Sequence, residues 1–368
     1  MTPSTISQVL NNAPALSQQG DGTVAQATVN FTGGDALLGF SGSAWSQAPG
    51  QISLEVWLDG EPVGGQLSIY ANSGQMHMFL GRTWLHCQGV TAGPHQVMVV
   101  AGPTTITDLN DRVSLTLWQL GDGVALRTTL DAPCPSGTGG QLLVSSEYGQ
   151  RGGALLLSSS GSGWVTQAGT SVGIVMLWDR GDALIGHIFA NNANQHLATV
   201  PVDLTYPNSA RGQHTVSLRA FSNTSTDSGD YGHVAAIEWV QPAQAPTILA
   251  TNPYLQDAQA NTQQGGEYIA QTAFQSSGGT LLFRVNASAW TPNPNTLLGL
   301  SLQVDGKPLG RAELFANPAS THLTVVSNDL VLTGIPAGNH TFEMQSDVST
   351  YTDQNDRVSI LALEFPKV

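Results

Sequence analysis

The chain repeats one stretch of sequence three times. Each copy carries a Gly-Gly pair, a tryptophan twelve residues later, an Ala-Asn pair, a histidine, a Gly-x-His and a Thr-Asp-x-(Asn/Gly)-Asp segment. Corresponding residues are separated by 119 and then by 126 positions, as in Trp45, Trp164 and Trp290 or His77, His196 and His322. A period of this length equals one ordinary domain. The sequence therefore predicts three modules: module 1 (1–120), module 2 (121–240) and module 3 (241–368).

The composition limits the classes of partner. Charged residues make up only 10% of the chain and hydrophobic residues 40%, which is enough to build cores and argues against disorder. The net charge of −14 argues against binding to nucleic acid or to an anionic membrane surface. No apolar stretch is long enough to span a bilayer. Residues 1–12 lack the basic start and apolar core of a signal peptide, so secretory export is not expected.

Only two cysteines are present, Cys87 and Cys134. Their spacing offers neither a disulfide framework nor a Cys-x-x-Cys metal pattern. We expect two free thiols.

Apolar residues alternate with polar ones in short runs. Ile52, Leu54, Val56 and Leu58 alternate with their neighbours and lead into Asp59-Gly60, as in a strand that enters a turn. Turn signals recur about every eight to twelve residues, and signals for helices are nearly absent. About eight short strands per module are typical of a jelly roll. The sequence predicts an all-β fold of three tandem antiparallel β-sandwich, jelly-roll-like domains from an internal triplication.

The repeated tryptophans and the paired aspartates each allow two interpretations. Trp45, Trp164 and Trp290 are predicted to plug one end of each sandwich, and a sugar-stacking platform is the alternative. The paired aspartates could bind calcium, which takes six to eight oxygen ligands, or could form turns in which they bind nearby backbone amides. These calcium candidates are Asp108, Asp111, Asp227, Asp230, Asp353 and Asp356.

The histidines allow a metal site of another kind. His77 and His95 could join Asp108 or Asp111 around a transition metal. A neutral histidine that binds a loop carbonyl at a strand end is the alternative. No nucleophile elbow, phosphate-binding loop, His-Glu-x-x-His or dinucleotide motif is present, so we expect no enzymatic activity and no required cofactor.

Differences between the copies are the better guide to a specific function. Aromatic residues and histidines that occur in one module only are candidate contacts for a sugar or a neighbouring subunit. The candidates are Trp84, His86, Tyr206, Tyr231 and Tyr351. Placement in a strand core is the alternative for Trp84.

Two resemblances accompany these patterns. The segments Asp59–Gly64 and Ala92–Val99, and more closely Asp305–Gly310 and Pro336–Phe342, resemble those of carbohydrate-binding β-sandwich modules. The tandem β-domains, the scarcity of charge and the abundance of Gly, Ser, Thr, Asn and Gln resemble the virion proteins of tailed bacteriophages.

These resemblances imply a non-enzymatic structural protein of a virion, which would serve as a capsid decoration, tail or fibre component. Its partners would be other virion proteins in a symmetric assembly or copies of itself. The alternative is a carbohydrate-binding protein for host attachment, located on a virion, outside the cell or at a cell surface. Neither alternative involves nucleic acid or a membrane.

Overall fold

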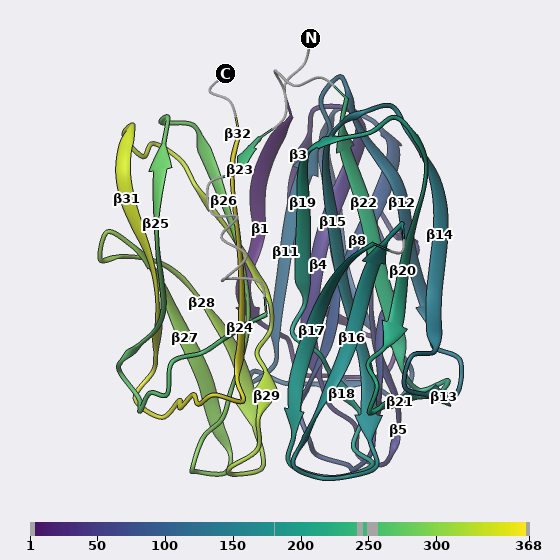
Figure 1. Ribbon diagram of the computed structural model, residues 1–368, viewed down its shortest axis with the longest axis vertical. Coiled ribbons are helices and arrows are strands. Elements are labelled where there is room, and N and C mark those ends of the chain that lie inside the picture. The colour runs from purple at the N-terminus through teal and green to yellow at the C-terminus, as the bar shows by residue number, and fades with distance from the viewer. Residues whose placement is uncertain (1–3, 180, 241–245, 249–256, 366–368) are drawn as a thin grey trace.

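The computed structural model describes residues 4–179, 181–240, 246–248 and 257–365. These residues form strands and turns (Figure 1). A search of the same residues finds no helix with the length and apolar character to cross a membrane. Of the sequence that makes module 3 longer than the others, residues 241–245 and 249–256 lie outside the described part.

Module 1 is a sandwich of two antiparallel sheets, which we call inner and outer. Its inner sheet has the strand order β1 (Thr5–Pro14), β11 (Arg112–Gln119), β4 (Gly34–Ala44), β8 (Met78–Val90). Its outer sheet has the order β3 (Thr23–Phe31), β9 (Gly93–Ala101), β5 (Gly50–Leu58), and β5 also pairs with β6 (Glu61–Pro62) and β7 (Leu67–Ala71). A short pair, β2 (Gln18–Gln19) and β10 (Ile106–Thr107), closes one end.

Module 2 repeats this arrangement. Its inner sheet runs β12 (Val124–Pro133), β22 (Tyr231–Trp239), β15 (Gly153–Val165), β19 (Val202–Ser209), with short β13 (Gly137–Thr138), β18 (Leu197–Ala198) and β21 (Thr224–Thr226). Its outer sheet runs β14 (Leu142–Gln150), β20 (Gly212–Ala220), β16 (Thr170–Trp178), β17 (Asp182–Ala190).

Module 3 follows the same order. In its inner sheet β32 (Arg357–Phe365) pairs with β23 (Thr247–Ile248), β24 (Ala258–Gln259) and β26 (Thr280–Ala289), and β26 pairs with β29 (Leu323–Thr324) and β30 (Asn328–Leu332). Its outer sheet runs β25 (Tyr268–Ser276), β31 (Gly338–Ser346), β27 (Thr296–Val304), β28 (Lys307–Ala316). Two four-stranded sheets with this crossing order form a jelly roll, which confirms the predicted fold class.

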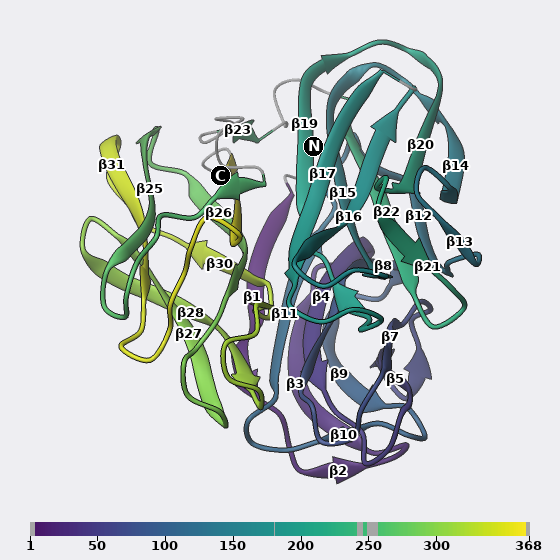
Figure 2. The same cartoon turned by 60° about the horizontal axis from the view of Figure 1, so that its bottom comes forward.

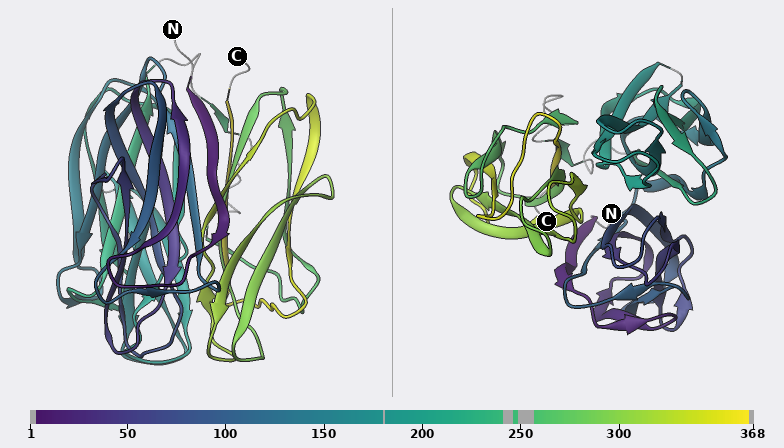
Figure 3. Two further views of the ribbon diagram at one scale, coloured as in Figure 1. Left: turned by 180° about the vertical axis from the view of Figure 1, so that it is seen from behind. Right: turned by 90° about the horizontal axis from the view of Figure 1, so that it is seen from below.

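The three sandwiches surround a common pseudo-threefold axis, as the view from below shows (Figure 3), and a tilted view shows the modules packed side by side (Figure 2). The inner sheets face this axis, and their central strands β11, β15, β22, β26 and β32 are buried on both faces. The strand at residues 112–119 shows the result, because Ser114, Thr116 and Trp118 are buried as completely as Val113 and Leu115.

An apolar cluster fills the axis between the inner sheets. Its members come from all three modules, and Trp118 lies at its centre. The Trp118 ring contacts the rings of Trp84, Trp239 and Phe365 at centroid distances of 5.6, 5.3 and 5.3 Å. Removing this much apolar surface from water is the main force that holds the modules together.

A charged cluster lies beside this apolar cluster and is also buried. Asp329 of module 3 accepts hydrogen bonds from Arg82 of module 1 at 2.6 Å and from Arg284 of module 3 at 3.1 Å. Arg284 also donates to Asp203 of module 2 at 2.7 Å. Two arginines and two aspartates leave the cluster neutral, as buried charges require. Burial raises the pKa of Asp329, but the two guanidinium groups lower it by more, so the carboxylate stays ionised.

The three modules differ in sequence at the charged cluster, so the threefold pseudosymmetry is lost there. The same cross-strand pair of the inner sheet is Gly39–Trp84 in module 1, Ser158–Asp203 in module 2 and Arg284–Asp329 in module 3. The guanidinium carbons of Arg284 and Arg82 lie 4.6 and 5.3 Å from the centroid of the Trp84 ring. A Cβ at Gly39 would lie 3.0 Å from that ring and 3.3 Å from the Asp329 carboxylate, so a larger residue there would push the ring or the carboxylate aside.

We expect Asp329→Ala to lower the free energy of unfolding by about 3–5 kcal/mol, because it leaves two buried guanidinium groups without their shared carboxylate. Urea denaturation measures this change. Glu343→Ala removes an acid from the outer sheet whose side chain binds only Gln271 among the described contacts, and should cost less than about 0.5 kcal/mol. Equal costs for the two variants would show that the charged cluster does not tie the modules together.

Candidate functional site: the seams between the modules

The asparagine of each Ala-Asn pair binds the next module. The backbone amide of His196 donates to Oδ1 of Asn72 at 2.6 Å, and that of His322 donates to Oδ1 of Asn191 at 2.8 Å. The amide of His77 donates to Oδ1 of Asn317 at 2.8 Å, so module 3 binds module 1 in the same way. The contacts thus close into a ring, and we call each contact region between consecutive modules a seam.

The turn before each histidine is shaped for this contact. Gln75, Asn194 and Ser320 occupy the same position and all have positive φ angles, of 63°, 57° and 53°. In two seams the carbonyl of this residue accepts a second hydrogen bond from the same asparagine: Asn72 donates to Asn194 at 2.9 Å and Asn191 to Ser320 at 3.0 Å. Left-handed backbone at residues other than glycine is costly unless its surroundings fix it, and the asparagine supplies that constraint.

Each seam histidine lies between two aromatic rings. One belongs to the repeated tryptophan of its own module, as for Trp45 and His77 at 5.8 Å between centroids. The other belongs to the preceding module in the ring, two residues before its asparagine. These second contacts are Phe315 with His77 at 5.0 Å, Tyr70 with His196 at 5.3 Å and Phe189 with His322 at 5.1 Å. The tryptophans therefore cover the seam histidines and are only half-buried, rather than plugging a sandwich end alone.

The paired aspartates hold the histidine ring in place. Oδ1 of Asp111 lies 2.9 Å from Nδ1 of His77 and accepts a hydrogen bond from Ser43 at 2.9 Å, while its Oδ2 accepts the amide of Asp108 at 3.0 Å. The same bonds recur around Asp230 and Asp356. Burial lowers the pKa of His196 and His322, but the hydrogen bond and charge of the aspartates raise it by more.

These bonds bear on the two metal hypotheses. The structure brings each calcium candidate pair together beside a seam histidine, in the groups His77, Asp108, Asp111; His196, Asp227, Asp230; and His322, Asp353, Asp356. Both oxygens of Asp111 already accept hydrogen bonds, and Oδ1 of Asp108 accepts the amide of Asn110 at 2.7 Å. The arrangement matches the alternative of a side-chain-stabilised turn. Calcium binding remains a prediction that a chelator titration can test.

His95 does not join the seam cluster, so the hypothesis that it shares a metal with His77 is wrong. It instead locks a hairpin of the outer sheet. Nδ1 of His95 lies 2.6 Å from Asp59, and Nε2 lies 2.9 Å from the carbonyl oxygen of Thr91. The pairs Asp179–His214 and Asp305–His340 repeat this contact. Both ring nitrogens face acceptors, and only a doubly protonated imidazole can donate to both.

A second contact in each seam comes from the first inner strand or, in module 3, from the residue just before β24. Asn12, Asp131 and Asp257 occupy equivalent positions, and each binds the module that precedes it in the ring. Asp131 accepts from Thr83 at 2.7 Å, and Asp257 lies 2.6 Å from Nδ1 of His187. Asn12 donates to Glu313 at 2.9 Å.

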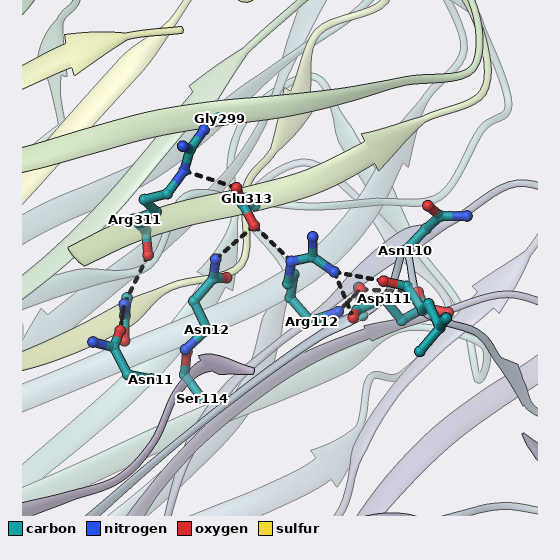
Figure 4. A network of polar contacts seen from close by, with 12 residues as sticks. Asn11, Asn12, Asn110, Asp111, Arg112, Ser114, Gly299, Arg311 and Glu313 are labelled. Carbon is teal, nitrogen blue, oxygen red and sulfur yellow. Dashed lines mark hydrogen bonds and ion pairs between the residues drawn. The ribbon is translucent and has the colours of Figure 1, made fainter. Parts of the chain in front are cut away.

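The seam between modules 3 and 1 carries a larger network (Figure 4). Glu313 of β28 accepts from Arg112 at 2.6 Å and from Asn12, and forms an ion pair with Arg311 at 2.8 Å. Arg112 also donates to the carbonyl of Leu109 at 2.8 Å. A buried carboxylate bound to two modules closes the ring between the first and last parts of the sequence.

The structure places two of the five ligand candidates together, because Trp84 and His86 line one open pocket of about 340 Å³ between modules 1 and 2. Trp84 is only 2% exposed and lies under two guanidinium groups, which matches its alternative placement in the strand core. The others are partly exposed. Tyr206 packs on Trp178 at 4.2 Å, Tyr351 packs on Trp290 at 5.2 Å, and the hydroxyl of Tyr231 accepts from Gln66 at 3.0 Å across the 1–2 seam. His86 lies 3.5 Å from Asp35.

An open pocket of about 460 Å³ lies at the seam between modules 1 and 2. Its lining comes from both modules: Gln51, Tyr70, His196, Asp227, Ser228 and Gly229. Sequence reasoning overlooked Gln51 and Tyr70, because they became notable only once the structure placed them beside module 2. A difference between the copies could have identified Tyr70, because the equivalent residues of the other modules are Phe189 and Phe315.

No known protein family and no curated protein sequence matches the chain. Solved structures resemble it weakly. An archaeal virus protein described by a triple jelly roll fold and turret assembly is 11% identical to this chain; the match covers 97% of this chain and 90% of the other, with a TM-score of 0.21. Tandem carbohydrate-binding modules of a Streptococcus pneumoniae glycoside hydrolase are 8% identical, and the match covers 64% of this chain and 93% of the other, with a TM-score of 0.20. Tandem modules of a Paenibacillus barcinonensis protein are 11% identical, and the match covers 68% of this chain and 94% of the other, with a TM-score of 0.22. Similarity at this level transfers no role to this chain.

We expect Asn72→Ala to lower the free energy of unfolding by about 1–3 kcal/mol, because it removes two hydrogen bonds across the 1–2 seam. Asn192→Ala is the matched control, since Asn192 is exposed and bonds only Gln195 of its own module among the described contacts. Urea denaturation of both variants would contradict the seam role of Asn72 if they lost equal stability.

The histidines predict a stability that falls from mildly acidic to alkaline pH. The aspartates raise the pKa of His95 and His340, chiefly through hydrogen bonds, above the ordinary 6.5. Because these folded-state pKa values exceed the unfolded value, the stabilisation is complete below about pH 6.5 and is lost as pH rises through the folded values. The carboxyl groups of Asp59 and Asp305, which pair with these histidines, have pKa values below the ordinary 3.8. Their contribution to stability is therefore complete above about pH 3.8 and is lost as the pH falls through the lowered values.

Thermal melts between about pH 5 and pH 9 test this dependence. The variant D59N/D179N/D305N should melt at a temperature that changes less over the same range. An unchanged slope in that variant would assign the effect to other groups.

Proposed function

We propose that the protein is a non-enzymatic structural component of a virion, a decoration, tail or fibre protein that occupies a position of threefold symmetry in the particle. The observation that supports this most is the closed ring of seams. Three equivalent modules in one chain present equivalent loops around one axis, and a surface with that geometry can bind a trimer or a threefold site of an assembly.

The use of the repeated polar residues also supports a structural role. Histidines and aspartates that could serve catalysis elsewhere bind one another within each module, and the backbone amides of these histidines bind the asparagine of the preceding module. A catalytic group needs reach to a substrate atom, whereas the seam histidines are buried between aromatic rings.

A second function, host attachment through glycan binding, is favoured by one observation. The pocket at the 1–2 seam combines an aromatic ring with amide, carboxylate and hydroxyl groups, which together suit a polyhydroxylated ligand.

The structural function predicts that the chain is a stoichiometric part of purified particles. Mass spectrometry of gradient-purified particles should find it at a fixed copy number relative to the major capsid or tail proteins. Cryo-electron microscopy should place it on a threefold axis or against a trimeric partner. Its absence from particles, or its presence only as a free secreted protein, would contradict the proposal.

A further inference from the structure

The pocket at the 1–2 seam lies where the three copies differ. Tyr70 stands where the other modules have Phe189 and Phe315. On the adjacent strand, Gln51 pairs with Tyr70, whereas Ser171 pairs with Phe189 and Leu297 with Phe315. The two substitutions add a phenol hydroxyl and a carboxamide to a single seam.

The module 2 side of the pocket differs as well. Gly229 stands where the other modules have Asn110 and Asn355. A Cβ at Gly229 would lie 2.7 Å from the Cβ of Tyr70, so glycine lets the tyrosine approach the loop closely. Nε2 of Gln51 donates to the carbonyl of Gly229 at 3.4 Å, which ties the amide to the same loop.

Several polar groups of this pocket remain free for a ligand. Within the described part of the chain the Tyr70 hydroxyl has no hydrogen-bond partner, and Ser228 is exposed. Oδ2 of Asp227 lies 3.8 Å from Nε2 of His196, beyond hydrogen-bond distance. Nε2 of Gln51 donates to Ser68 and Gly229, so its Oε1 is the atom left to accept from a ligand. This oxygen, the Tyr70 hydroxyl and a carboxylate oxygen can bind adjacent sugar hydroxyls, and the C–H face of a pyranose packs against an aromatic ring.

The charge of the site selects among sugars. Two carboxylates, Asp227 and Asp230, lie beside one histidine, and the whole chain carries a net charge of −14. This field repels sialic acid, uronic acids and phosphorylated glycans.

We propose that the pocket formed by Gln51, Tyr70, Asp227 and Ser228 binds a neutral hexopyranose, such as the terminal residue of an uncharged glycan. The proposal rests on the second function above, glycan binding, and names its site and ligand class. Among the three seams of the described residues, the 1–2 seam alone combines these side chains.

The test uses the full chain on an array of neutral and sialylated glycans, followed by calorimetric titration with the methyl glycoside of the best-bound neutral sugar. The variant Q51L/Y70F gives the 1–2 seam the residues of module 3 and should weaken binding at least tenfold. The matched control S171L makes the same kind of change at the 2–3 seam and should leave the affinity unchanged. Thermal melts confirm that both variants fold.

The possible failures are distinct. If neither neutral nor sialylated glycans bind, glycan binding itself fails together with this site. If a neutral glycan binds the wild type and Q51L/Y70F equally, the protein binds glycans elsewhere and the site is wrong. Preference for sialylated glycans would overturn the ligand class.

Discussion

The rest of the structure depends on the burial of three inner sheets against one another. A jelly roll needs only one face of each sheet for its own core, yet here the second face of every inner sheet is also apolar and buried around Trp118. Exposed, these faces would form large apolar patches that a soluble module does not tolerate. The three modules are therefore parts of one folding unit, and the seams and the pocket exist because the axis holds them in register.

The modules are joined by two kinds of contact, the seams and the charged cluster at the axis. The seams are nearly symmetric, with one asparagine, one histidine and two aspartates repeated in each. The axis is asymmetric, with a tryptophan, two aspartates and two arginines in a fixed arrangement. Symmetric seams set how each module sits against the next. The asymmetric axis allows only one order of the three modules.

Sequence analysis could predict the fold because the repeat and the strand alternation are local signals. It predicted free thiols at Cys87 and Cys134, and both are free and buried. It assigned no partner to the repeated asparagines, yet Asn72 of module 1 binds the backbone amide of His196 of module 2. A single repeat cannot show whether a residue contacts its own copy or the next one. Trp118 was hidden in a strand that reads as half-buried, since Ser114 and Thr116 on the same face look solvent-exposed until another module covers them.

The glycine opposite Trp84 has a consequence for how the modules can be combined. If module 1 assembled with two copies of itself, three indole rings would compete for the space that one now fills, and three copies of module 3 would bring three guanidinium groups together. Modules 1 and 3 are thus not interchangeable at the axis. A single polypeptide solves this packing problem, because it delivers one Gly–Trp, one Ser–Asp and one Arg–Asp pair to every axis in equal number.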